Sequence, residues 1–256
     1  MTKKIKTGIV AVMLTGSCSM GQAQKINLSK WQFGVQAGVN VYMGDLTPEP
    51  LGAYKTMKPA LALYAARVLS PSFMLRGNLL FSRLKADEAK YSKPDWRQQR
   101  NFNFTTPVTE LSGLLVWNIF KNNDNYLDRR FSPYLFAGAG VSFMRVQRDY
   151  SNMNTTIFND ASEVRAGLTQ DLAVTPPRSL LVLPMGAGVE YYISPRVSLT
   201  AETNFRYSFT DYIDGFSKAA NPNKKDYYYT HTLGVIFKFG DSGSGKSKTG
   251  CPVQVY

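Results

Sequence analysis

Cysteine and histidine are the scarcest chemically versatile residues in this sequence. Its 256 residues include two cysteines, Cys18 and Cys251, and one histidine, His231. Zinc sites are built from several Cys and His ligands, and nucleophilic hydrolases pair Ser or Cys with a histidine base. Because neither set can be assembled here, we expect no metal site, no cofactor and no catalytic residues. The sequence therefore predicts a protein that is not an enzyme.

Long apolar runs are also missing. No stretch of the sequence reaches the roughly 18 consecutive apolar residues that a membrane-spanning helix needs. Open sheets and loops leave backbone N–H and C=O groups unsatisfied in lipid. If this chain enters a membrane, it must therefore do so as a closed β-barrel.

The first 23 residues are typical of a signal peptide for export. Three lysines precede a short apolar segment over 8–14, and small residues at 21–23 suit cleavage. A lipoprotein signal acylated at Cys18 is the alternative, although Leu14 lies one residue too far ahead of that cysteine. Either signal takes the chain out of the cytoplasm, so residues 1–23 take no part in the predicted fold.

The chain is strongly basic, with 30 Lys and Arg against 18 Asp and Glu and a formal charge of +12. Without the three lysines of the signal peptide, the mature chain carries +9. An exported protein rarely meets nucleic acid, so we expect no nucleic-acid partner. The charge favours contact with anionic lipid head groups or an acidic partner, and solvated loop charges are the equally weighted alternative.

Residues 31–43 alternate strictly in polarity. Every odd position is apolar, and every even position from 32 to 40 is polar or glycine. Strand side chains alternate between faces with a period of two, so this segment is a strand with one apolar and one polar face. The same kind of pattern recurs and predicts eight strands, at 31–43, 59–69, 72–84, 106–120, 132–146, 179–193, 196–209 and 227–239.

The length of these strands favours a membrane. Strands of globular proteins average about 5–6 residues, whereas a tilted strand needs about 9–11 to cross a bilayer. The connectors alternate between short turns (70–71, 121–131, 194–195) and long loops (44–58, 85–105, 147–178, 210–226). Outer-membrane barrels are built in this way, with the short turns in the periplasm.

We therefore predict an all-β fold, an eight-stranded antiparallel transmembrane β-barrel over residues 24–240. It would lie in the outer membrane of a Gram-negative bacterium, in contact with outer-membrane lipid, with both termini in the periplasm. Residues 241–256 are rich in Gly, Ser and Lys and predict a flexible periplasmic tail. This region includes a match to the phosphate-loop pattern at 240–247, but the few residues after it leave no room for the helix that nucleotide binding requires.

Charged residues interrupt the polar faces of the predicted strands. They would point into the barrel lumen: Arg76, Glu110, Glu190, Glu202, Arg206 and Lys238. A catalytic carboxylate pair is one interpretation of this set. An eight-stranded interior is just wide enough for side chains to fill it, and buried charges need partners. We therefore favour a lumen charge network that acts as a salt-bridged plug. The single histidine, His231, falls on the outward face, which favours a position in the aromatic girdle.

Several segments carry a resemblance to a known family. They are WQFGVQAGVNVYMGDL at 31–46, FMLRGNL at 73–79, FNF at 102–104 ahead of Glu110, FSPYLFAGAGV at 131–141, PMGAGVEY at 184–191 and FTDYID at 209–214. Together they resemble the PorG-like outer-membrane β-barrel family, which includes a component of the type IX protein secretion system. The resemblance extends over nearly the whole mature chain.

This resemblance implies a non-enzymatic barrel that anchors the periplasmic ring of the secretion system. Its partners would be a ring lipoprotein (PorK-like) and the ring partner of that lipoprotein (PorN-like). Cys251 would then be a candidate for an interchain disulfide to the lipoprotein, with an idle thiol as the alternative. A generic outer-membrane barrel is the second hypothesis. It would bind a ligand or surface partner through its long loops, or pass small solutes.

Overall fold

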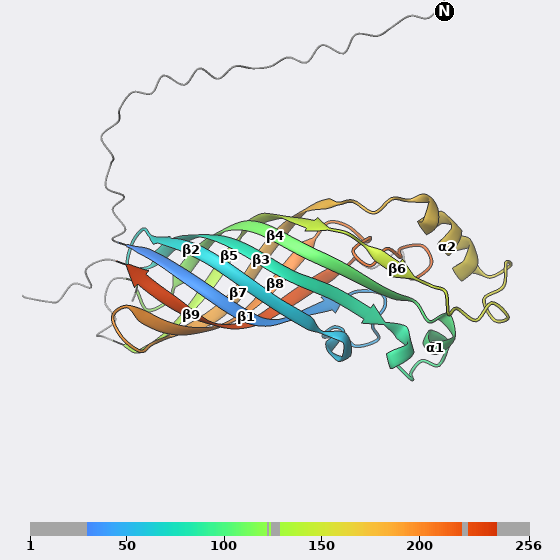
Figure 1. Ribbon diagram of the computed structural model, residues 1–256, viewed down its shortest axis with the longest axis horizontal. Coiled ribbons are helices and arrows are strands. Elements are labelled where there is room, and N and C mark those ends of the chain that lie inside the picture. Colours follow the sequence, from blue (N-terminus) through green and yellow to red (C-terminus); the bar gives the residue numbers. More distant parts are fainter. Residues whose placement is uncertain (1–29, 122, 124–128, 222–224, 240–256) are drawn as a thin grey trace, which may run out of the picture.

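Eight long antiparallel strands close into a barrel in the computed structural model, which describes residues 30–121, 123, 129–221 and 225–239 (Figure 1). The wall strands are β1 (Trp31–Met43), β2 (Lys58–Val68), β3 (Phe73–Asp87), β4 (Asn103–Asn118), β5 (Phe131–Met144), β7 (Ser179–Tyr192), β8 (Val197–Ser208) and β9 (Tyr227–Phe239). Each strand pairs with its neighbours in sequence order, and β9 pairs with β1 from Trp31–Phe239 to Met43–Tyr227. The predicted eight-stranded barrel is confirmed.

The strand bounds lie close to those predicted from the alternation of polar and apolar residues. β1 and β9 coincide with the predicted segments, and most other ends differ by one or two residues. The exceptions are β3 and β4, which continue three residues further, to Asp87 and from Asn103. A ninth strand, β6 (Gln147–Asp149), pairs only with β4 and stands outside the closed wall.

The connectors sort by length, as the sequence predicts. The short turns after β2, β4 and β7 lie at one end of the barrel, together with Lys30 and Phe239 (Figure 1, left). The long loops lie at the other end, and they contain η1 (Tyr54–Thr56), η2 (Glu88–Lys90), α1 (Trp96–Arg100) and α2 (Glu163–Ala173). We call these the short-turn end and the long-loop end. In the described part of the chain, no helix has the length and hydropathy needed to cross a membrane.

The barrel is apolar outside and polar inside. Large apolar side chains face outward on most strands, with exposed fractions of 46% for Val35, 61% for Leu111 and 70% for Leu233. Polar side chains such as Gln36 and Asn78 face inward and are buried. A soluble sandwich would bury the apolar faces against a second sheet. Here most of that apolar surface has no cover from the described residues, which is the arrangement of a barrel wall that faces lipid. Val41, which is buried beside Gly52 of the following loop, is an exception.

The orientation of β2, which its sequence leaves ambiguous, is settled by pairing. Leu61 and Leu63 are exposed on the outer face, whereas Ala62 and Tyr64 are buried in the interior. Tyr64 pairs across to Gly34 of β1. A Cβ atom on Gly34 would collide with the Tyr64 ring, so this glycine makes room for the large inward ring.

The long loops fold over their end of the barrel. The largest buried apolar cluster joins strand residues such as Tyr42 and Phe104 to loop residues such as Leu168 and Phe216. The rings of Phe102 and Phe216, from different loops, stack at 4.4 Å between centroids. The segments 44–57, 88–102, 145–178 and 209–221 thus form one packed layer, which we call the loop cap (Figure 1, right).

Candidate functional site

The six charged residues predicted for the lumen form three ion pairs inside the barrel. Arg76 on β3 meets Glu202 on β8 through two bonds, with Nη1–Oε1 at 2.6 Å and Nη2–Oε2 at 3.2 Å. Arg206 on β8 meets Glu110 on β4, with Nε–Oε2 at 2.6 Å. All four side chains are almost completely buried. Each pair joins strands that are not neighbours in the wall, so both pairs cross the interior.

The third ion pair lies nearer the short-turn end. Lys238 Nζ on β9 lies 2.7 Å from Glu190 Oε1 on β7. The ammonium group also sits 3.7 Å from the ring centroid of Tyr192. A cation over a ring face is attracted by the ring's quadrupole, so this lysine is held from two sides.

Aromatic rings cover the arginines of the interior. The Arg76 guanidinium lies 4.8 Å from the ring centroids of both Tyr64 and Phe136. Tyr134 Oη donates a 2.5 Å hydrogen bond to Glu202 Oε1. A Cβ atom on Gly188 would lie 2.6 Å from the Tyr134 ring, so that glycine is needed for the ring to fit. Charged and aromatic side chains together fill this level of the lumen.

The network around Glu110 extends the filled region toward the loop cap. Glu110 Oε2 accepts hydrogen bonds from Arg206 Nε and from Tyr228 Oη, the latter at 3.1 Å. Ser112 and Ser142 also donate to this carboxylate, at 3.2 and 3.4 Å. Each interior carboxylate therefore has a cation beside it. This arrangement is suited to holding the wall strands in register, because removing either partner of a buried pair is strongly destabilising.

A second polar centre lies under the loop cap, where Tyr42 touches two carboxyl groups. Its Oη lies 2.7 Å from Asp214 Oδ2 and 2.5 Å from Asp226 Oδ1. A phenol has one hydrogen to donate, so one of the two contacts requires a protonated carboxyl group. Burial raises the pKa of Asp226 to about 8. Burial, and next the charge of Asp226, raise the pKa of Asp214 well above its ordinary value.

Asp171 ties helix α2 to the loop before β9. Its carboxylate accepts hydrogen bonds from the backbone N–H groups of Ser217, Lys218 and Ala219, at 3.1, 3.0 and 2.9 Å. The helix begins at a capped end, where Ser162 Oγ accepts from the N–H of Arg165. A Ser cap followed by Glu163 is a start signal that the sequence carries.

Glu88 organises the other half of the loop cap. It is fully buried and accepts from Arg97 Nη1 at 2.8 Å, from Arg100 Nε at 2.9 Å and from the N–H of Phe102 at 3.3 Å. Arg100 Nη1 also donates to the carbonyl oxygen of Ala219 at 3.0 Å. The bonds of Glu88 and of Asp171 thus converge on the same loop. Sequence reasoning missed both carboxylates, because their partners are distant in the chain or are backbone groups.

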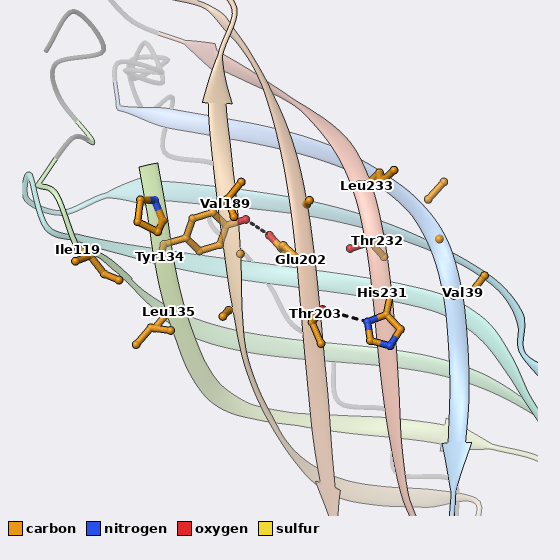
Figure 2. Close-up of a pocket in the computed structure, with 16 residues that line it drawn as sticks. Val39, Ile119, Tyr134, Leu135, Val189, Glu202, Thr203, His231, Thr232 and Leu233 are labelled. Atoms are coloured by element: carbon orange, nitrogen blue, oxygen red, sulfur yellow. Dashed lines mark hydrogen bonds between the residues drawn. The ribbon is translucent and has the colours of Figure 1, made fainter. Parts of the chain in front are cut away.

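The outer wall contains a shallow groove of about 760 Å³ that crosses β1, β9, β8, β7 and β5 (Figure 2). Small outward residues such as Ala37, Ala187 and Ala201 create it. His231 lines this groove, and its ring hydrogen-bonds Thr203 Oγ1 at 3.1 Å and Tyr54 Oη at 2.9 Å. The single histidine is therefore on the outward face among aromatic residues, where the sequence places it.

Two predicted features cannot be located. The signal peptide at 1–23 and Cys251, in the tail at 241–256, lie outside the described residues.

Several outer-membrane proteins have a similar barrel. Ail, the attachment invasion locus protein of Yersinia pestis, is 13% identical with a TM-score of 0.43, covering 82% of this chain and 97% of its own. Neisserial surface protein A is 16% identical with a TM-score of 0.45, covering 82% and 98%. OprG of Pseudomonas aeruginosa is 10% identical with a TM-score of 0.42, covering 83% and 97%.

The apolar outer wall and the filled polar interior make this protein a β-barrel of the outer-membrane type. No curated protein matches the sequence. Residues 7–243 match the family described as a domain of unknown function, DUF6089. Since the match extends over most of the chain, this protein belongs to the DUF6089 family.

Proposed function

We propose that this protein is a non-enzymatic barrel of the outer membrane that anchors the periplasmic ring of a type IX protein secretion system. The observation that carries the proposal is the filled interior. Three partnered ion pairs and the rings around them occupy the lumen. A barrel whose interior is occupied in this way is suited to binding a partner at one of its ends. The resemblance to PorG-like barrels supports the choice of the secretion system.

The short-turn end is the surface that we assign to the ring. In outer-membrane barrels the short turns are periplasmic, which would also put both termini there. Six exposed cations surround this end, namely Lys30, Arg67, Lys121, Arg129, Arg130 and Arg196. In the sequence of the three short turns, four basic residues (Lys121, Arg129, Arg130 and Arg196) outnumber the two acidic residues, Asp124 and Asp128. This charge fits a partner with an acidic surface, because complementary potentials speed and orient docking.

We assign a PorK-like ring lipoprotein, together with its PorN-like partner, to this surface. Cys251 would reinforce the contact by an interchain disulfide, since an unpaired cysteine in an oxidising compartment is available to another chain. The matched variant is Cys251→Ser. It should keep the barrel's heat-modifiable migration and lose a crosslinked band on a non-reducing gel. Absence of such a band from the wild type would remove the disulfide from the proposal.

Co-purification tests the anchor itself. The full-length protein is extracted from cells in mild detergent, captured through a tag, and its partners are identified by mass spectrometry. We expect a ring lipoprotein to be recovered, and we expect less of it from an Arg67→Glu/Arg196→Glu variant. Recovery of the barrel alone would contradict the anchor function. Stepwise ion conductance in planar bilayers would point instead to small-solute passage.

Binding of a ligand or surface partner at the loop cap is the second candidate function. The observation that favours it is the order of the cap, which Glu88 and Asp171 hold through buried bonds. A preorganised surface loses less entropy on binding than flexible loops do. The two functions separate experimentally, because substitutions on the cap would leave ring co-purification unchanged.

A further inference from the structure

The outward side chains of β3, β4 and β5 form successive rows toward the long-loop end. Strand pairing puts Phe81, Thr109 and Phe143 in one row. The next row is Arg83, Pro107 and Arg145, since Arg83 pairs with Pro107 and the Arg145 N–H bonds to the Pro107 carbonyl. Beyond it come Lys85, Thr105 and Gln147, and then Asp87, Asn103 and Asp149.

These rows mark the edge of the apolar wall on this side of the barrel. Phe81 and Phe143 are 42% and 53% exposed, and Leu111, one row below, is 61% exposed. The next outward residue on β3 is Arg83, and the residue after β5 is Arg145. The outward side chains thus change from hydrocarbon to guanidinium within two residues along the strand, which is about 7 Å. This is the spacing between acyl chains and head groups that a long basic side chain can bridge.

Arg83 and Arg145 are exposed, and neither forms an ion pair with any residue that the structure describes. One strand, β4, separates their backbones, which puts them about 10 Å apart. Lys85 stands one row further out, about 7 Å along β3. The result is two guanidinium groups and one ammonium group above an apolar surface.

The opposite side of the same end is built differently. The outward positions of β8 and β9 near the long-loop end carry Phe205, Tyr207, Tyr227 and Tyr229. Those rings contact one another at 5.2 to 5.5 Å between centroids. No Lys or Arg occupies these outward positions. The exposed Lys225 lies two residues before Tyr227, but β8 and β9 present no arginine outward near this end, so the two guanidinium groups distinguish the β3–β5 side from the aromatic side.

We propose that the Arg83–Arg145 face binds the head group of a phosphorylated glycolipid in the leaflet around the long-loop end. Guanidinium groups bind phosphate through two parallel hydrogen bonds. Two of them, on backbones about 10 Å apart, fit a head group with phosphates at both ends. The acyl chains would lie on Phe81, Leu111 and Phe143. This inference rests on the membrane placement in the proposed function, but it does not depend on the secretion ring.

Lipid binding by the full-length protein in non-ionic detergent tests this inference. The probe is bisphosphorylated lipid A, and its dephosphorylated form is the comparison; native mass spectrometry measures both affinities. The wild type should bind the phosphorylated lipid at least tenfold more tightly. Arg83→Gln/Arg145→Gln should lose this preference, and Arg83→Lys/Arg145→Lys should keep only part of it. The control Arg67→Gln/Arg196→Gln removes two exposed cations at the other end and should bind as the wild type does.

A wild type without the preference, or a Gln variant that retains it, would overturn the inference. So would displacement of the lipid by inorganic phosphate at equal concentration, because that would make the site one for free phosphate. Insertion of the wild type into lipid vesicles is measured separately. Failure to insert would refute the membrane placement itself. Loss of ring co-purification in the wild type would refute only the anchor function.

Discussion

At the scale of single residues, the main feature of this molecule is that the buried charged side chains of its lumen each lie beside a partner of opposite charge. The guanidinium of Arg76 is fully enclosed, and it is tolerated because Glu202, Tyr64 and Phe136 surround it. Placing Arg76 and Glu202 on the polar faces of their strands was within reach of sequence analysis, since alternation decides which side chains point inward. The choice of partners was not, because Arg76 and Glu202 are 126 residues apart and meet only across the closed lumen.

Removing one partner of the Arg76–Glu202 pair should be costly. Glu202→Leu leaves the Arg76 charge buried and uncompensated, which should lower the free energy of unfolding by about 3–5 kcal/mol. The double variant Arg76→Met/Glu202→Leu should recover most of that loss. Urea unfolding of the barrel in lipid vesicles, followed by heat-modifiable migration, measures both.

The exposed pair Lys55–Glu49 supplies the control for that experiment. Its atoms are 3.8 Å apart, and both side chains are more than one-third exposed. Glu49→Gln should therefore change the stability by less than about 1 kcal/mol. Equal effects of Glu49→Gln and Glu202→Leu would contradict the role assigned to the interior pair.

The carboxyl groups beside Tyr42 predict a pH-dependent loop cap. The folded pKa of Asp226 is about 8, well above the ordinary value of 3.8. Between these two pH values, Asp226 therefore keeps its proton in the folded cap and releases it when the cap opens. Stability is greatest in acid and falls as the pH rises toward 8, by about tenfold in the opening equilibrium per pH unit. The backbone N–H of Ile213 donates to Asp226 Oδ2 at 3.1 Å, so its hydrogen exchange, corrected for the intrinsic rate, measures this opening.

Asp226→Asn is the matched variant, since its amide cannot ionise. Opening at Ile213 should depend less steeply on pH in this variant than in the wild type. The pH dependence of opening that remains in this variant would come from Asp214, whose pKa is also raised. Greater protection of Ile213 in the wild type at pH 8 than at pH 5 would show that the assigned direction is wrong.

At the scale of elements, the wall strands and the loops follow different rules. Alternation located β1 and β9 without error, because an outward apolar face opposite a polar lumen face continues along most of each strand. It stopped three residues short on β3 and β4, where residues such as Lys85 and Thr105 lie beyond the apolar edge. The outer face there is polar, so the period-two signal disappears although the hydrogen bonding continues. The loop cap has no repeating pattern at all.

Helix α2 offers a test of how the cap is held together. Asp171→Ala would leave three N–H groups without their acceptor, two of them buried, at a cost of about 2 kcal/mol or more. We expect faster protease cleavage within residues 209–221, while the heat-modifiable migration of the barrel stays unchanged. Asp160→Ala is the control, because Asp160 is an exposed acid in the same loop. Similar cleavage rates for the two variants would contradict the anchoring role of Asp171.

At the scale of the whole molecule, the outer wall decides the environment. Leu111 near mid-wall is 61% exposed, and Leu172 on α2 is 44% exposed. In water, both substitutions to Arg would be nearly neutral. In a bilayer, Leu111→Arg should cost about 2–4 kcal/mol, whereas Leu172→Arg in the loop cap should cost less than about 0.5 kcal/mol. Folding yield into lipid vesicles compares the two variants, and equal yields would contradict a lipid-facing wall.

The sequence by itself determined the closed barrel, the number of wall strands, the faces of most of them and the charged character of the lumen. These properties follow from local alternation and from strand length, which any single strand displays. Only the tertiary structure decided which charges pair, how the loops become a cap around Glu88 and Asp171, and that Arg83 and Arg145 share a row. Each of these depends on strand register and ring closure. Register brings together residues that have no relation along the chain.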